Sequence, residues 1–393
     1  MYAGTQAASF EQAARDLSQL AELDISDQRV RRATIRIGTE RVQERDEQTA
    51  AFAALPLPQQ RVSPALHTPQ AVCVEMDGGR MQIRERGAEQ SERTNECFWR
   101  EMKVGCLTTL TREVHTADPC PQLPAAFRDR EKMAQIAREI KGVASAAAPA
   151  KEAAKAGTAE VAEPAADDRA GRPQPLARSV VATRRGVDEF GPLLAAAAWS
   201  RGFAAASAKA FVADGAEANW GVWRRWFSDY VPILDFVHAL CYIYAAALAG
   251  RTVEQGWALY CQWAQWVWSG QVQHVIAALE ERLAELGELD PDEPDSSPRQ
   301  QVAKTLGYLT NQQERMRYAA YRQAGLPITS SGVESTIKRI NRRVKGSEKF
   351  WSVGAEALLT LTADHLSDTA TLAHFWRNRP HRLTGLRCYH QAA

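Results

Sequence analysis

The chain has 393 residues, of which 45% are hydrophobic and 8% aromatic, so it is long enough and apolar enough for two or three packed domains. The 48 basic and 47 acidic residues leave a net charge of +1, which excludes binding to nucleic acid through overall charge alone. No apolar run approaches the roughly 20 residues of a membrane span. The N-terminus lacks the features of a signal peptide and the seven cysteines follow no paired spacing. We therefore expect a cytoplasmic protein that does not use a membrane.

Residues 1–65 are predicted to be mainly helical. Apolar residues recur at helical spacing over Phe10–Leu23. Ser26 is a suitable N-cap for a second helix with three arginines near its start. Two interpretations stay open: a helix-turn-helix that binds DNA, or a helical pair that packs on the rest of the protein.

Residues 66–250 are predicted to form an α/β core. Ala71–Met76 should form a buried strand that ends at Asp77-Gly78-Gly79, and alternating residues then predict a hairpin return. Phe98–Leu110 is a third candidate strand. Three strands close together, the first ending in an acidic residue, resemble the opening meander of a ribonuclease H-like fold.

A low-complexity segment interrupts this core at about residues 142–178. It is rich in alanine and proline and has no aromatic residue, so it cannot supply a packed core. We predict a flexible or weakly helical insert there, followed by an alanine-rich helix over Val187–Phe203.

Two further strands are predicted from short apolar runs that stop at acidic residues. Ala210–Ala213 stops at Asp214, and Val231–Leu234 stops at Asp235, three residues before His238. Such runs are typical of buried strands in α/β sheets. Ligands of these sheets bind at the carboxyl ends of the strands, so Asp214 is a candidate metal ligand or catalytic acid.

Residues 251–325 are predicted to be an all-α segment. It begins with a capping-box pattern at Thr252, and four tryptophans follow. These aromatic residues could stack on nucleic-acid bases, but their helical periodicity favours packing in a core. In residues 326–393, Ser331 is predicted to cap a helix that carries Glu334, and a last helix is predicted over Ala355–Leu366.

Three acidic residues, Asp77, Asp214 and Glu334, are the candidate catalytic groups. Carboxylates that converge repel one another unless a proton or a cation neutralises them. Oxygen-only ligands favour Mg²⁺ or Mn²⁺, and two ions about 3.5–4 Å apart suit phosphodiester chemistry. Each residue also has a plain structural interpretation. The two Asp-Gly pairs suit turns, Ser331 and Glu334 suit a capping box, and His238 suits a core position.

An ordered set of motifs resembles the DDE transposases of bacterial insertion sequences, in particular the Kra-type insertion-sequence family. The resemblance covers about Val72 to Arg387. It is carried by the segments VEMDGGRMQIR, FWREMKVG, FVADGAEANW, ILDFVHA, LGYLTNQQERMRYAAYRQAGLPITSSGVESTIKRINRRVKGSEKFW and GAEALLTL.

The resemblance implies a ribonuclease H-like catalytic core with an all-α insertion and an N-terminal helical region. It makes Asp77, Asp214 and Glu334 the triad that binds Mg²⁺ or Mn²⁺, with two ions expected. Asp235 and His238 match an Asp-x-x-His signature and are expected to support the site without direct metal ligation. The insert and the helical segment account for the 137 and 120 positions that separate the three acids.

The expected activity is cleavage of a transposon end followed by joining of its 3′-hydroxyl to target DNA. A dimer is expected because two ends must be brought together. The basic run at 338–349 begins one turn after Glu334, so we expect it to contact phosphates, although a solvated helix face is the alternative. Its residues are Lys338, Arg339, Arg342, Arg343, Lys345 and Lys349. Two other functions stay open: a metal-dependent nuclease without strand transfer, and an inactive, transposase-derived DNA-binding protein.

Overall fold

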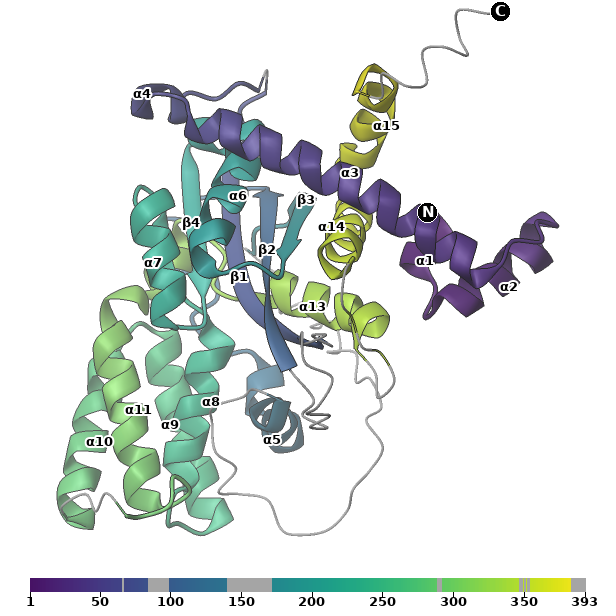
Figure 1. Ribbon diagram of the computed structural model, residues 1–393. Helices are drawn as coiled ribbons and strands as arrows, with labels where there is room; N and C mark the ends of the chain where they lie inside the picture. Colours follow the sequence, from purple (N-terminus) through teal and green to yellow (C-terminus); the bar gives the residue numbers. More distant parts are fainter. Residues whose placement is uncertain are drawn as a thin grey trace, which may run out of the picture.

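A computed structural model describes residues 1–65, 67–83, 99–139, 172–287, 292–345, 349, 351 and 354–382 of the chain (Figure 1). These residues form an α/β structure built on one mixed sheet, with helices on both faces and a helical bundle beyond one end. Residues 142–171 of the predicted insert lie outside the described residues. Among the described helices, none combines the length and the apolar character that a membrane crossing needs.

The sheet has five strands in the order β3-β2-β1-β4-β5. Strand β2 is antiparallel to both β1 and β3, whereas β1, β4 and β5 run parallel to one another. Parallel neighbours need crossover connections, and helices supply them here. The strand bounds are β1 (Ala71–Gln82), β2 (Trp99–Leu110), β3 (Pro175–Thr183), β4 (Ala208–Ala213) and β5 (Val231–Leu234).

Two predictions about this sheet are wrong. Strand β1 does not stop at Asp77-Gly78-Gly79 but continues to Gln82, because β2 pairs with it along its whole length. The return strand is β2, and the two glycines lie inside β1. The predicted insert also extended too far at its C-terminal end. Residues Pro175–Arg178 belong to β3, which is the third strand of the meander.

Alternating side chains give the sheet two apolar faces. On one face, Gly105 lies against Leu194 of α6. On the other face, the neighbouring Val104 packs in a cluster with Val333 and Leu358. One layer therefore holds α6 (Val187–Ser200) and α7 (Glu217–Trp226), and the other holds α13 (Ser331–Val344) and α14 (Ala355–Leu366). The predicted helix over 355–366 is confirmed, and the helix predicted over 187–203 is present but ends at Ser200.

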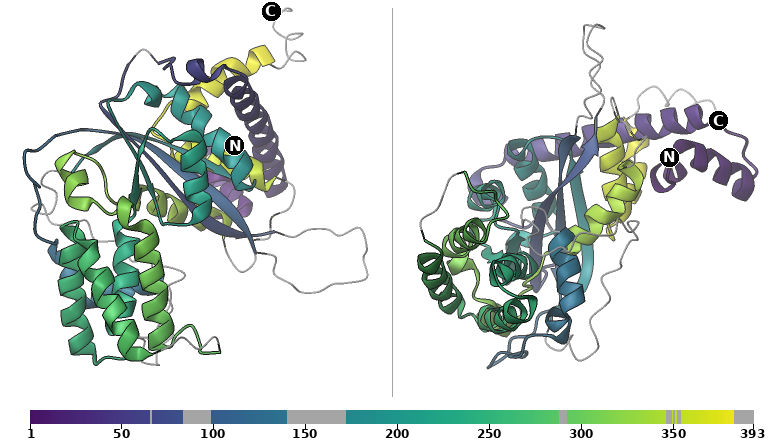
Figure 2. Two further views of the ribbon diagram at one scale, coloured as in Figure 1. Left: turned by 90° about the vertical axis from the view of Figure 1, so that its left-hand side faces the viewer. Right: turned by 90° about the horizontal axis from the view of Figure 1, so that it is seen from below.

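A bundle of four helices lies beyond the carboxyl ends of β4 and β5 (Figure 2). Trp263 and Trp268 are fully buried in it, which confirms core packing for these tryptophans. Trp257 and Trp266 are partly buried against the same core. The bundle consists of α8 (Phe236–Leu248), α9 (Val253–Trp268), α10 (Val272–Leu286) and α11 (Pro298–Gln312). Next to it are the 3₁₀ turn Ala125–Arg128, α5 (Arg130–Glu139), the 3₁₀ turn Gln313–Arg315 and α12 (Tyr318–Gln323).

The N-terminal region is helical, as predicted, and its third helix is much longer than expected. Helix α3 spans Asp27–Ala53, begins at the Ser26 cap, and contacts both α14 and α6. Gly38 of α3 lies so close to Ala357 of α14 that a side chain would not fit between them. This helix therefore joins the two helical layers across the sheet (Figure 1). The short elements around it are α1 (Tyr2–Gln6), α2 (Phe10–Ala21), α4 (Leu57–Gln60), the 3₁₀ turn Phe203–Ala205 and α15 (Thr371–Arg382).

Candidate functional site

Three aspartates lie in one row at the end of the parallel strands. Glu75 of β1 pairs with Val212 of β4. Continuing this register by two residues places Asp77 beside Asp214, the residue that follows β4. Ala213 pairs with Leu234, which places Asp214 and Asp235 at equal height on neighbouring strands. The strand register therefore brings together residues that are far apart in the sequence. Asp77 reaches this row from inside β1, whereas Asp214 reaches it from a strand end as predicted.

Helix α13 brings the fourth carboxylate, Glu334, to the same place. The helix packs on β1, and Glu334 lies in its first turn, where its charge interacts with those of Asp235 and Asp77. The predicted capping box is absent: the N-cap is Ser330, and its side chain makes no bond to α13. Ser331 is the first helical residue. Glu334 is thus free of the capping role that the sequence allowed.

Burial and mutual repulsion shape the acidity of the site. Burial, followed by the neighbouring Asp214, raises the pKa of Asp77 to about 6, although the Gly78 N–H donates to its carboxylate. Burial and the nearby Asp235 raise the pKa of Glu334 to about 7. Both groups would lose a proton more readily beside a cation.

Asp214 is held by hydrogen bonds from both sides of its turn. Its Oδ1 accepts from the Ala216 N–H at 3.0 Å and from Asn219 Nδ2 at 2.8 Å. Its backbone carbonyl accepts from the hydroxyl of Tyr308 at 2.7 Å. Tyr308 belongs to α11, so the helical bundle directly fixes the loop that carries this carboxylate.

Asp235 and His238 form a bridge between α8 and α13. Asp235 is fully buried and is the N-cap of α8, accepting from the His238 N–H at 2.9 Å. Its second oxygen accepts from both the N–H and the hydroxyl of Ser330. Both oxygens of Asp235 are therefore engaged by protein donors, which matches a supporting role.

The ring of His238 lies between two carboxylates. Its Nδ1 is 3.4 Å from Asp235 Oδ1 and 3.9 Å from Glu334 Oε1. Burial disfavours the charged ring, but the adjacent Asp235 carboxylate outweighs it and raises the pKa of His238 to about 9. His238 is then protonated at neutral pH and partly offsets the charge of Glu334.

The donor set suits a divalent cation. Asp77, Asp214 and Glu334 offer carboxylate oxygens from β1, from the end of β4 and from α13, and Asp77 interacts electrostatically with both others. One ligand atom each from Asp235, His238 and Glu334 also lies within 4.8 Å of the others. This group contains neither Asp77 nor Asp214, and Asp235 already accepts three hydrogen bonds from His238 and Ser330. Oxygen ligands of this kind fit Mg²⁺ or Mn²⁺.

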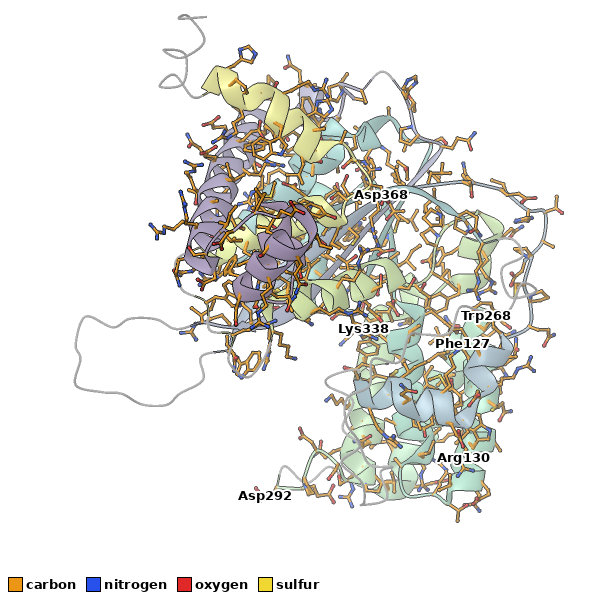
Figure 3. The ribbon with its side chains drawn as sticks, turned by 90° about the vertical axis from the view of Figure 1, so that its right-hand side faces the viewer. Phe127, Arg130, Trp268, Asp292, Lys338 and Asp368 are labelled. Atoms are coloured by element: carbon orange, nitrogen blue, oxygen red, sulfur yellow. The ribbon has the colours of Figure 1, made fainter. Side chains whose placement is uncertain are left out.

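The basic run divides into exposed and internal residues. Lys338, Arg339, Arg342 and Lys345 are exposed, and Lys338 lies on the part of α13 close to the bundle (Figure 3).

Arg343 does not fit the predicted phosphate-contacting set. It is only 4% exposed and donates to the backbone carbonyls of Gly4 and Ala8, which ties α13 to the N-terminal helices. Lys349 donates to the carbonyls of Arg342 and Arg343 at the end of α13. Its ammonium group is therefore used within the protein.

Sequence reasoning missed several polar residues that surround the carboxylates. They lie on four different elements or loops, so no local pattern connects them. Only Asn219 could have been inferred from the sequence, because it follows Asp214 by about one helical turn in the segment DGAEAN. The missed residues are Glu75, Asn219, Tyr308, Gln312 and Ser330.

No protein-family model matches the chain, and no curated protein matches it. The functional proposal therefore rests on the residues of the site and on the resemblance carried by the sequence motifs.

Proposed function

We propose that this chain is a DDE-type transposase that cuts the ends of an insertion sequence and joins them to target DNA. The observation that carries the proposal is that Asp77 and Asp214 lie at one level of the sheet and that the charge of Asp77 interacts with those of Asp214 and Glu334, although the three acids are 137 and 120 positions apart in the sequence. Burial and neighbouring acidic groups raise the pKa of Asp77 and that of Glu334, a feature that is typical of sites serving a cation or a proton transfer.

The architecture supports a ribonuclease H-like core. Three antiparallel strands are followed by two parallel ones, in the order β3-β2-β1-β4-β5. The bundle α8–α11 lies between the second and third acids in the sequence, where the resemblance places an all-α insertion. The N-terminal helices and the exposed face of α13 are the candidate DNA-binding regions of the same protein.

Each residue of the site has a defined task in this proposal. Asp77, Asp214 and Glu334 would hold two ions of Mg²⁺ or Mn²⁺, and the bound cations would supply Lewis-acid activation of a water or 3′-hydroxyl. Asp235 orients the first turn of α13 through Ser330, and protonated His238 balances the charge of Glu334. Exposed Lys338 and Arg342 would bind phosphate oxygens, so affinity for DNA should fall with salt.

The partners in this proposal are transposon-end DNA and target DNA, with two cations per site. A homodimer in the cytoplasm would bring two ends together.

The test is an assay with the DNA that flanks the coding gene as donor, a supercoiled plasmid as target, and Mg²⁺ or Mn²⁺. We expect both cleavage and joining from the wild type. Asp214→Asn should lower both by on the order of 10³-fold, equivalent to roughly 4 kcal/mol of transition-state stabilisation. Asp229→Asn is the matched control, because Asp229 pairs with Lys209 at the opposite end of β4 and β5.

Three results would overturn the proposal in different ways. Cleavage without joining would indicate a nuclease. Salt-sensitive DNA binding without either reaction would indicate a DNA-binding protein. Full activity of Asp214→Asn would remove the carboxylates from the chemistry.

A further inference from the structure

A fifth acidic residue, Glu75, lies beneath the site and has no part in the proposed chemistry. It precedes Asp77 by two positions on β1, so both side chains leave the same face of the strand. Glu75 is 7% exposed. A carboxyl group with so little access to water is costly to bury, and it must be compensated by specific partners.

The partner of Glu75 is the first turn of α13. The backbone N–H of Val333 donates to Glu75 Oε2 at 2.8 Å. Gly332 lies directly against the same carboxyl group, and a Cβ at this position would come within 2.4 Å of Oε2. A methyl group at 332 would therefore displace either the Glu75 carboxyl group or the first turn of α13.

This contact replaces a cap that α13 lacks. The first N–H groups of a helix have no partner within the helix, and an N-cap side chain usually supplies one. Ser330 is the N-cap, but its hydroxyl donates to Asp235 and does not bond to α13. Glu75, which belongs to the sheet, therefore accepts a hydrogen bond from the first turn of α13, whereas the side chain of the N-cap residue accepts none.

We infer that Glu75 is a positioning residue that sets the place of Glu334 relative to Asp77. It lies two residues from Asp77 along β1, and its bonded partner Val333 is adjacent to Glu334 along α13. One carboxyl group therefore connects the two elements that carry the first and third acids of the triad. This inference rests on the proposed function, because it assumes that Asp77 and Glu334 act together.

The experiment compares three variants of the full-length chain. Glu75→Gln keeps an acceptor for the Val333 N–H, so its cleavage rate should stay within a few-fold of the wild type. Glu75→Leu removes the side-chain acceptor and leaves the Val333 N–H only its bond to the Ser330 carbonyl. The value of kcat should then fall on the order of 10²-fold while KM for DNA changes little, because small misplacements of reacting groups are costly. Gly332→Ala disturbs the same contact, but by a change on the helix and not on the strand. It should lower kcat by a similar factor.

The matched control is Gly307→Ala in α11, where an added methyl group meets nothing within 4 Å. Alanine also favours a helix more than glycine does, so a loss of activity in Gly332→Ala cannot come from helix propensity. Urea unfolding of each variant identifies any that fails to fold. If Glu75→Leu fails to fold, Gly332→Ala alone tests the inference.

The Mg²⁺ dissociation constant, measured by calorimetry, provides a second readout. Glu75→Leu and Gly332→Ala should bind Mg²⁺ about 10-fold or more weakly, as for other groups that orient metal ligands. Wild-type activity in a folded Glu75→Leu or in Gly332→Ala would overturn the inference while leaving the proposed function intact. A wild type that neither binds Mg²⁺ nor cleaves DNA would instead overturn the proposed function.

Discussion

At the scale of single residues, the site is a cluster of acids whose charges are only partly balanced. The ring of His238 lies near Asp235 and Glu334, and the charge of Lys338 also lowers the pKa of Glu334. Burial and repulsion keep the pKa of Asp77 at about 6 and that of Glu334 at about 7. These values predict that metal binding and proton release are linked.

We expect Mg²⁺ binding at pH 6.5 to release protons. A cation favours the ionised carboxylates, so binding lowers the pKa of Asp77 and Glu334 and expels the protons that they still hold near pH 6–7. Affinity for Mg²⁺ should accordingly weaken as pH falls from 8 to 5. Calorimetry in two buffers of different ionisation enthalpy measures the number of protons released. Equal heats in both buffers, with affinity independent of pH, would contradict this prediction.

At the scale of elements, α11 acts on the site through one tyrosine. Tyr308 stacks on Tyr242 of α8 with ring centroids 3.8 Å apart, and its hydroxyl donates to the Asp214 carbonyl. Gln312, one turn later, donates to the Gly215 carbonyl at 3.2 Å. Gly215 has φ of +96°, a conformation that favours glycine, and its neighbour Tyr308 leaves no room for a side chain. The bundle therefore fixes the shape of the Asp214 turn.

Tyr308→Phe should reduce the affinity for Mg²⁺ clearly while it lowers the stability of the fold only slightly. The ring and its stacking remain, but one hydrogen bond is lost, at a cost of about 1 kcal/mol in the free energy of unfolding. Mg²⁺ affinity should fall about 10-fold, because the loop that carries Asp214 loses a support. Tyr321→Phe is the control, since the hydroxyl of Tyr321 makes only 3.4 Å contacts away from the carboxylates. Equal Mg²⁺ affinity in both variants and the wild type would show that α11 does not support the site.

At the scale of the whole molecule, ion pairs hold α3 against α14. Arg41 Nε of α3 lies 2.9 Å from Asp364 Oδ2 of α14, and both side chains are 7% exposed. Arg45 of the same helix pairs with Glu356 at the other end of α14. Buried charges need their partners, because an unpaired one loses its hydration without compensation.

Asp364→Asn should therefore destabilise the protein by about 3 kcal/mol, because it leaves Arg41 with less compensating charge in the interior. Urea denaturation gives the free energy of unfolding. Glu11→Gln is the matched control, because it breaks the exposed Arg15–Glu11 pair and should cost less than about 1 kcal/mol. A variant as stable as the wild type would mean that the Arg41–Asp364 pair does not hold α3 in place.

Local patterns in the sequence were sufficient for much of the fold. Apolar runs gave β4 and β5, and helical periodicity gave α6, α14 and the packed tryptophans of α9. The glycines after Asp77 were misleading, because pairing with β2 extends β1 through them. Strand β3 was hidden because its first residues share the composition of the insert.

The sequence by itself determined which carboxylates to consider, since Asp214 follows a buried strand and Glu334 begins a helix. Only the tertiary structure decided how they meet. Strand register sets Asp77, Asp214 and Asp235 in one row, and a long-range bond from Val333 to Glu75 places Glu334 beside them. The tertiary structure also decided that Arg343 is buried, because Arg343 donates to N-terminal carbonyls that are more than 330 positions away in the sequence. Such contacts depend on the packing of distant elements, which local sequence patterns do not encode.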